Sequence, residues 1–268
     1  MPKITTEDRE QFAEKSKPHK IAINKILAFE EAELADIKKN PENVEHRKVK
    51  LCEKMIEISQ LYVAINRLSV DILSGAKNND ALNDARKIMY KAIIYLEDVV
   101  TAIVDTDFTE IKDKIDLIAD IPLKDRYYLM RKLGLALKLL VDAFGDNTKW
   151  RWSFVELEGR FAIVMKNFLD WKEAIKVYFD SSSDEYDITV NYIRILTAQM
   201  DKASKEYRDR YELSTHRLDD MRFAINCTLA QRRIALLIDE PEEAEEMKKR
   251  ATSWRAKVEH EQKVGAAT

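Results

Sequence analysis

Few residues in this sequence have the types and the spacing that metal binding requires. The four histidines are scattered along the chain: His19, His46, His216 and His260. None belongs to a His-Glu-x-x-His motif, and none follows a glutamate at the Glu-x-x-His spacing of di-iron bundles. The two cysteines, Cys52 and Cys227, lie far apart and form no Cys-x-x-Cys zinc motif. We therefore predict that the protein has no metal site.

The motifs that bind phosphates or present a catalytic nucleophile are also missing. The sequence contains no Gly-x-x-x-x-Gly-Lys, Gly-x-Gly-x-x-Gly or Gly-x-Ser-x-Gly. Asp219-Asp220 begins like the Asp-Asp-x-x-Asp magnesium motif of helical isoprenoid enzymes, but Phe223 stands in place of the third carboxylate. We predict that the protein is not an enzyme and binds no cofactor.

The least ordinary cluster of side chains surrounds Trp150, Arg151 and Trp152. Together with Trp171, this segment holds three of the four tryptophans within 22 residues. Tryptophan and arginine are enriched in binding hot spots, and a guanidinium over an indole ring forms a cation–π contact. One interpretation is that Trp150, Arg151, Trp152 and Trp171 bind a protein partner or a second copy of this chain. The other is that one indole faces the core and its neighbour packs under a loop.

The composition predicts the fold class. The chain has only 5 Gly and 5 Pro in 268 residues, whereas sheets joined by tight turns need many more of both. Apolar residues recur at steps of three and four, as in Phe154, Leu157 and Phe161, which is the spacing of bundle and coiled-coil seams. Breakers and capping residues divide the chain into about seven to nine helices. We predict an all-α fold, an elongated antiparallel helical bundle with long, coiled-coil-like helices.

Gly145 ends one predicted helix, and Asp146 begins the cap of the next. We therefore predict an N-terminal helical bundle over residues 1–145 and a C-terminal long-helix region over residues 146–268. These two parts are either separate domains or one continuous domain.

The segment 184–239 contains no Gly or Pro in 56 residues. It forms either one long helix or two helices joined by a turn at Ser214-Thr215-His216. Within it, residues 201–212 carry a ladder of oppositely charged side chains four positions apart, such as Asp201 with Lys205. Because such pairs support an exposed helix, we predict that this stretch projects as an arm with little cover.

Charge and hydropathy narrow the choice of partners and location. Lys and Arg number 45, Asp and Glu number 48, and the net charge is −3 with no basic block, so we predict no nucleic-acid partner. No window approaches the roughly 18 apolar residues of a transmembrane segment, while peripheral membrane contact stays open. The opening residues lack the apolar stretch of a signal peptide, and both cysteines are interpreted as reduced thiols. We expect a cytoplasmic protein.

These observations favour a non-enzymatic structural or scaffolding protein. We predict that it self-associates as a homo-oligomer, or docks through helix faces onto protein partners in a larger assembly such as a filament, cytoskeletal or motor-type complex. Two alternatives stay open: a helical-hairpin adaptor resembling tetratricopeptide repeats that binds peptides, and a helical crescent that shapes membranes.

Overall fold

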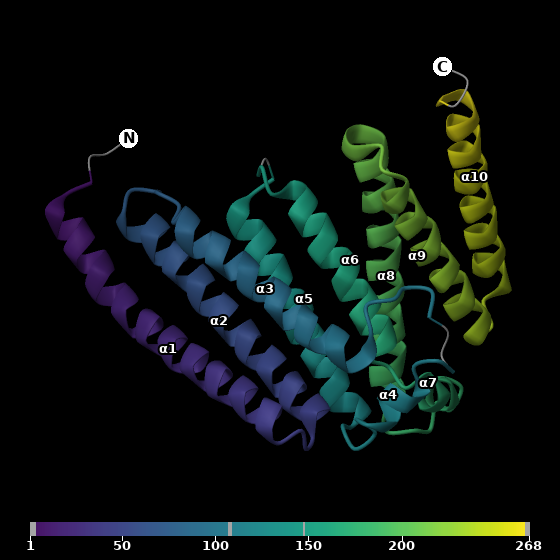
Figure 1. The fold of residues 1–268 in the computed structure, drawn as a ribbon, viewed down its shortest axis with the longest axis horizontal. Helices are drawn as coiled ribbons and strands as arrows, with labels where there is room; N and C mark the ends of the chain where they lie inside the picture. Colours follow the sequence, from purple (N-terminus) through teal and green to yellow (C-terminus); the bar gives the residue numbers. More distant parts are fainter. Residues whose placement is uncertain (1–3, 107–108, 147, 266–268) are drawn as a thin grey trace. The chain divides into compact units, whose positions relative to one another are not determined.

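The computed structural model describes residues 4–106, 109–146 and 148–265. It is 82% helical, and the described residues form ten α-helices, one π-helix and no strand (Figure 1). The all-α class and the bundle arrangement of the helices are confirmed. The α-helices, in chain order, are α1 (Thr6–Lys39), α2 (Val44–Ile72), α3 (Asn79–Val100), α4 (Lys112–Asp116), α5 (Leu123–Phe144), α6 (Arg151–Asn167), α7 (Trp171–Tyr178), α8 (Tyr186–Arg210), α9 (Leu218–Leu237) and α10 (Pro241–Gly265).

The sequence predicted seven to nine helices, whereas the described residues form ten α-helices. The difference arises because the single helix predicted over residues 149–180 is interrupted. α6 ends at Asn167, and α7 begins at Trp171. Asp170 caps α7, its carboxylate accepting hydrogen bonds from the backbone amides of Lys172 and Glu173. The apolar spacing continues across this break, so periodicity alone did not reveal it.

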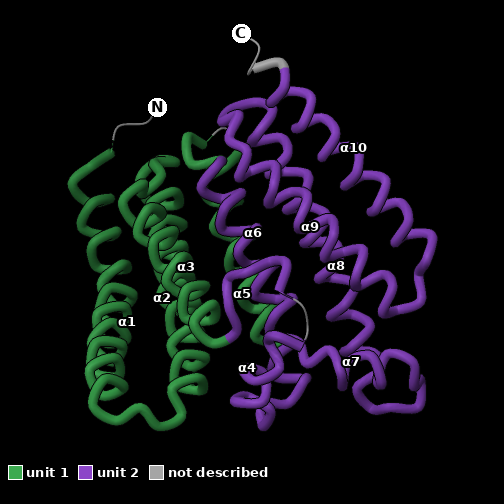
Figure 2. The backbone as a smooth tube through the Cα atoms, turned by 45° about the vertical axis from the view of Figure 1, so that its right-hand side comes forward, with its two compact units in different colours: residues 1–99, 128–151 green, residues 100–127, 152–268 purple. Residues whose placement is uncertain are grey.

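The chain forms two compact units, each described here by itself (Figure 2). Unit 1 contains residues 1–99 and 128–151, and unit 2 contains residues 100–127 and 152–268. Compactness does not show which parts fold independently, so the division of domains near residue 145 stays a prediction.

In unit 1, α1 and α2 form a hairpin that is fixed by one arginine. Arg47 donates from Nε to Glu33 at 2.5 Å, and from its terminal nitrogens to Asp36 at 2.6 Å and to the carbonyl of Asn40 at 3.0 Å. About one turn before Glu33 on α1, the buried carboxylate of Glu30 accepts a hydrogen bond from the Tyr95 hydroxyl on α3. These polar contacts orient α1, which buries few of its own side chains.

In unit 2, α6 is the central helix, because twelve of its 17 residues are buried. A close approach explains Gly159 in the middle of this helix. A Cβ atom there would lie 2.6 Å from the Tyr207 ring and 3.1 Å from the Phe223 ring. These two rings stack with their centroids 3.9 Å apart, and the missing side chain gives them room against α6.

Buried donors satisfy the carbonyl groups at the C-terminal end of α6. The Tyr192 hydroxyl donates to Met165 O at 2.8 Å, and Trp171 Nε1 donates to Lys166 O at 2.9 Å. Arg126, which is 3% exposed, donates to Phe168 O at 3.0 Å. The cationic group also complements the negative end of the helix dipole.

The segment 184–239 forms two helices, so the second of the two expected arrangements is correct. α8 passes into a π-helix, Tyr211–Thr215, and α9 begins at Leu218. His216 adopts the left-handed conformation with φ 48° and terminates the first helix.

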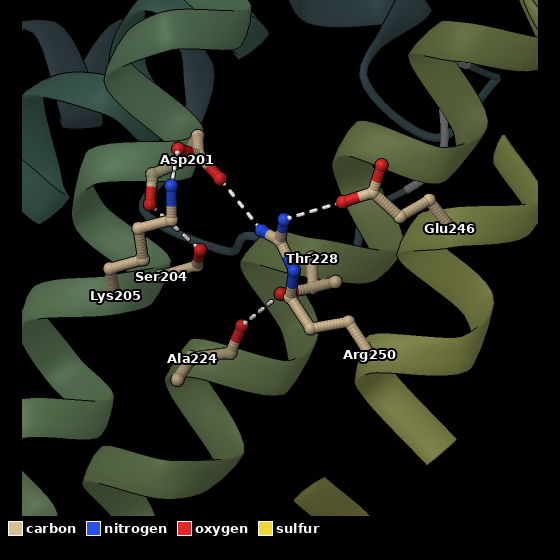
Figure 3. A network of polar contacts seen from close by, with 7 residues as sticks. All are labelled: Asp201, Ser204, Lys205, Ala224, Thr228, Glu246 and Arg250. Atoms are coloured by element: carbon tan, nitrogen blue, oxygen red, sulfur yellow. Dashed lines mark hydrogen bonds and ion pairs between the residues drawn. The ribbon is translucent and has the colours of Figure 1, made fainter. Parts of the chain in front are cut away.

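The expected exposed arm at residues 201–212 is wrong. Ala203, Ser204 and Tyr207 are buried where α8 packs on α9. Arg250 of α10 donates to Asp201 at 2.7 Å and to Glu246 at 3.1 Å (Figure 3). The ladder of charges therefore marks only one face of α8, and the small and aromatic residues between the charges form its buried face.

Candidate interaction surface

The structure places Trp150 against its own chain in unit 1. Its indole is half-buried, and the Arg86 guanidinium carbon of α3 lies 3.9 Å from the ring centroid. The Lys149 ammonium lies 5.3 Å from the same centroid. Trp150 therefore takes part in a cation–π contact within the chain, and its closest cation is Arg86, which the sequence analysis did not single out.

Trp152 and Trp171 both pack within unit 2. Trp152 is half-buried and packs on a cluster of buried side chains that includes Tyr211 and Met221. Trp171 is 5% exposed and, as described above, caps α6. Arg151 is exposed. The four predicted residues are thus divided between different surroundings, and the three tryptophans all pack against their own chain. Whether Trp150, Arg151 or Trp152 also contacts a partner stays a prediction.

A different surface has the character of an interaction site. On α5, Tyr128, Leu135 and Leu139 are 43%, 58% and 41% exposed. At 3.6 residues per turn these positions fall within roughly 40° of one another around the helix. They form one apolar line along the outer face of α5, which we call the α5 stripe.

The inner face of α5 is equally apolar. Leu133 and Leu140 are fully buried, and Leu137 is 2% exposed. Gln60 of α2 donates to the carbonyl of Ala136 at 3.4 Å, and the Lys77 ammonium donates to Phe144 O at the C-terminal end of the helix at 2.9 Å. The helix that carries the α5 stripe is therefore fixed along its length.

Charged residues flank the α5 stripe. Arg131, Lys132 and Lys138 are exposed, as is Asp142. Lys138 pairs with Asp142 at 3.2 Å, and Lys132 pairs with Glu53 of α2 at 3.6 Å. An apolar line with a charged rim is the usual composition of a protein interface.

A comparison with protein families identifies the chain. The sequence profile of the TP0443 family matches residues 8–262. The chain belongs to the TP0443 family. Searches of curated proteins and of solved structures find no match. The family description names no activity, so the comparison establishes the family of the chain but does not indicate a function.

The described part of this TP0443-family protein offers little reactive chemistry. It contains no group of three His, Cys, Asp or Glu side chains placed to hold a metal ion. Both cysteines are fully buried, and burial raises the pKa of each thiol, so they stay protonated. None of the described helices combines the length and apolar character needed to cross a membrane.

The sequence contained a signal for the α5 stripe. The run from Leu133 to Phe144 is its richest apolar window, interrupted by Lys138 and Asp142. A helix that buries only one face needs an apolar strip about 100° wide. Leu135 and Leu139 extend the apolar positions to the opposite face, which distinguishes α5 from an ordinary amphipathic helix.

Proposed function

We propose that this TP0443-family protein is a non-enzymatic structural protein of the cytoplasm that associates with a second copy of itself through the α5 stripe. The observation that carries the proposal is the exposure of Leu135 and Leu139 on a helix whose inner face is already buried. Exposed leucines scattered singly need no explanation, but a line of them on one rigid helix is typical of a contact surface.

The charges beside the stripe favour an antiparallel pair of α5 helices. When Leu135 of one copy lies opposite Leu139 of the other, Arg131 of the first copy comes near Asp142 of the second on the same flank. A parallel pair related by a two-fold axis would instead place Arg131 opposite Lys132, and the like charges would repel. The stripe is therefore self-complementary in one orientation.

The strength of this association follows from its size. Fully burying a leucine stabilises by about 1.5–3 kcal/mol, and the exposed part of each stripe residue contributes a fraction of that. A stable interface buries about 800 Å² on each partner, and three side chains supply only part of it. We expect a weak, concentration-dependent dimer that becomes stable when further contacts hold it in an assembly.

A register-specific disulfide tests the proposal. Cys52 and Cys227 are buried, so new surface cysteines can be oxidised without competition from native thiols. Leu135→Cys protein is mixed with Leu139→Cys protein that carries a size tag, and the mixture is oxidised gently. We expect mixed disulfide dimers to form faster than either homodimer, because the two positions face each other.

Ile21→Cys provides the matched control. Ile21 lies on α1 and is 59% exposed, compared with 58% for Leu135, so collision alone would cross-link it equally well. Equal rates for the mixed stripe pair and for Ile21→Cys would contradict the proposal.

A further inference from the structure

The segment that follows α3 contains an unusual backbone conformation. Thr101 has a φ of 94°, close to the values of 84° and 81° at Gly75 and Gly145. The other described non-glycine residues with positive φ are Asn, Ser, His or Asp, and none of these is β-branched. A β-branched residue in this region is strained, because its side chain crowds the neighbouring backbone. Such strain persists only where surrounding contacts impose it.

A buried amide of α6 supplies the first of these contacts. Residues 101–106 follow the end of α3, and we call them the strap. Asn167 Nδ2 donates to Thr101 O at 3.1 Å and to Ile103 O at 3.2 Å. The Asn167 side chain is fully buried, so both hydrogen bonds are shielded from water. They fix the beginning of the strap against the C-terminal end of α6.

A buried cation of α6 supplies the second contact. Lys166 is fully buried, and its ammonium group donates to Thr106 O at 2.9 Å. The same ammonium donates to Asn167 Oδ1 at 2.8 Å, which turns the amide nitrogen of Asn167 toward the strap. All of these residues belong to unit 2. The conformation of the strap is therefore imposed by two neighbouring side chains that are distant in sequence.

The sequence, by contrast, has no signal that would end α3 at Val100. Residues 96–106 contain no glycine, proline or asparagine, which are the residues that commonly terminate a helix. Ile103 and Val104 follow Val100 at steps of three and four, which continues the apolar period of α3. The local sequence therefore favours a longer helix than the one observed.

Local preference and tertiary contacts thus favour different conformations of the strap. In a continued helix, Thr101 would have an ordinary helical φ, and its carbonyl would accept from the amide of Asp105 four residues on. In the structure this carbonyl accepts from Asn167 instead, and Ile103 is 57% exposed. A conflict of this kind, combined with backbone strain, is typical of segments that change conformation in function.

We propose that the strap is a conformational switch with a latched and a released state. In the latched state, which the structure shows, the strap is bound to Lys166 and Asn167. In the less populated released state it leaves both side chains, and α3 continues as a helix for about one more turn. A partner that binds one of the states selects it. The switch directly follows residue 99, where the chain passes from unit 1 to unit 2, and it does not depend on the α5 stripe.

NMR spectroscopy of the full chain tests the proposal. In the wild type we expect relaxation dispersion on the μs–ms timescale at Thr101, Ile103 and Val104, because the two states interconvert. Asn167→Leu removes the donors that bind the strap and keeps a side chain of similar size. In this variant the Cα chemical shifts of Thr101 and Ile103 should move to helical values.

Thr101→Gly should act in the opposite direction. Glycine adopts a positive φ without strain, which favours the latched state, and it is a poor helix former, which disfavours the released state. The ratio of released to latched molecules should therefore fall at least about fivefold. Because this change relieves strain in the observed fold, it tests the switch even where Asn167→Leu fails to fold.

Asn66→Leu is the matched control. Asn66 is also a buried asparagine, 5% exposed, and it accepts from the backbone amide of Asn78 at 2.8 Å, just before the other end of α3. The same substitution there should lower the stability of the fold, because it leaves the Asn78 amide without its acceptor. It should leave the chemical shifts and the relaxation dispersion of the strap unchanged.

Four results would overturn the proposal. They are a wild type without exchange in the strap, a folded Asn167→Leu protein that keeps the wild-type shifts at Thr101 and Ile103, undiminished exchange in Thr101→Gly, or equal shift changes in Asn66→Leu. A higher Tm for Thr101→Gly without exchange in the wild type would show strain in a segment that does not switch.

Discussion

Two helices differ in the faces that they expose to solvent: α5, of which residues 128–144 belong to unit 1, and α10 in unit 2. α10 buries Ala244, Met247 and Ala251 on one face, and its exposed face is charged, beginning with Glu242 and Glu243. α5 is apolar on both faces. A charged outer face is the usual composition of a surface in contact with water, whereas the apolar outer face of α5 has the composition of a surface that contacts a partner.

The two helices also differ in the contacts that support them. α10 packs on α9, and charged contacts add to this packing: Arg250 pairs with Asp201 of α8 at 2.7 Å, and Lys257 pairs with Glu212 of the π-helix at 2.6 Å. α5 is held mainly by buried leucines. We therefore expect changes on α10 to alter the stability of the fold, and changes on the outer face of α5 to alter association alone.

The largest effect is expected from Leu135→Glu combined with Leu139→Glu. The double substitution removes the apolar contact and places like charges opposite each other, so the dimer should weaken by at least about 100-fold, or roughly 3 kcal/mol. Sedimentation equilibrium measures this change. The urea midpoint should stay close to that of the wild type, because both residues are exposed in the single chain.

Ile21→Glu, at a position of matched exposure on α1, is the control and should leave association unchanged. If it weakened the dimer as much as the double substitution on α5, the contact surface would have to lie elsewhere.

A smaller effect is expected from Arg250→Ala on α10. This change removes the ion pairs with Asp201 and Glu246 and the packing of the side-chain stem, so the free energy of unfolding should fall by about 1 kcal/mol. Urea denaturation measures it. The dimer constant should stay the same, and a parallel loss of association would remove the distinction between the two helices.

Charge exchange beside the stripe should have a still smaller effect. Arg131→Glu should weaken the dimer by about threefold, since a solvent-exposed pair contributes at most about 1 kcal/mol. Adding Asp142→Arg should restore most of the affinity if the antiparallel register is correct. A double variant weaker than the single one would point to another orientation of the two α5 helices.

The smallest effect concerns pH. Burial alone would raise the pKa of the Asp201 carboxyl, but hydrogen bonds from Lys205 and Arg250 outweigh it and hold the pKa below the ordinary value of 3.8. The stabilisation is therefore complete well above pH 3.8 and is lost as the pH falls through the lower folded-state pKa.

The Asp201→Asn variant should lack this acid dependence. The difference in free energy of unfolding between the variant and the wild type should be constant near neutral pH. In acid this difference should shrink by about half a kcal/mol. Acid titrations of the urea midpoint measure this. An unchanged difference across the range would show that the pair does not stabilise α10.

Sequence reasoning reached the fold class because the scarcity of glycine and proline and the apolar period are properties of the chain itself. It missed the break before Asp170, since the cap there follows an uninterrupted apolar pattern. It also read residues 201–212 as exposed, because Ala203 and Ser204 are small and give no hydrophobic signal although both are buried.

The candidate site was harder to predict for a different reason. Tryptophan is enriched in binding sites, and this enrichment was the basis of the prediction. In the structure, however, Trp171 donates a hydrogen bond to Lys166 O at the end of α6, and the Trp150 ring stacks under Arg86. Which leucines of α5 face outward depends on where α2 packs against it, and this is set by contacts distant in sequence such as Gln60 with Ala136.

The most direct test of the central claim is the mass of the wild-type protein by sedimentation equilibrium across a roughly hundredfold dilution. The account predicts a reversible shift from dimer to monomer on dilution, and a monomer at every concentration for Leu135→Glu with Leu139→Glu. A wild-type monomer throughout, or a dimer that the double variant retains, would contradict it.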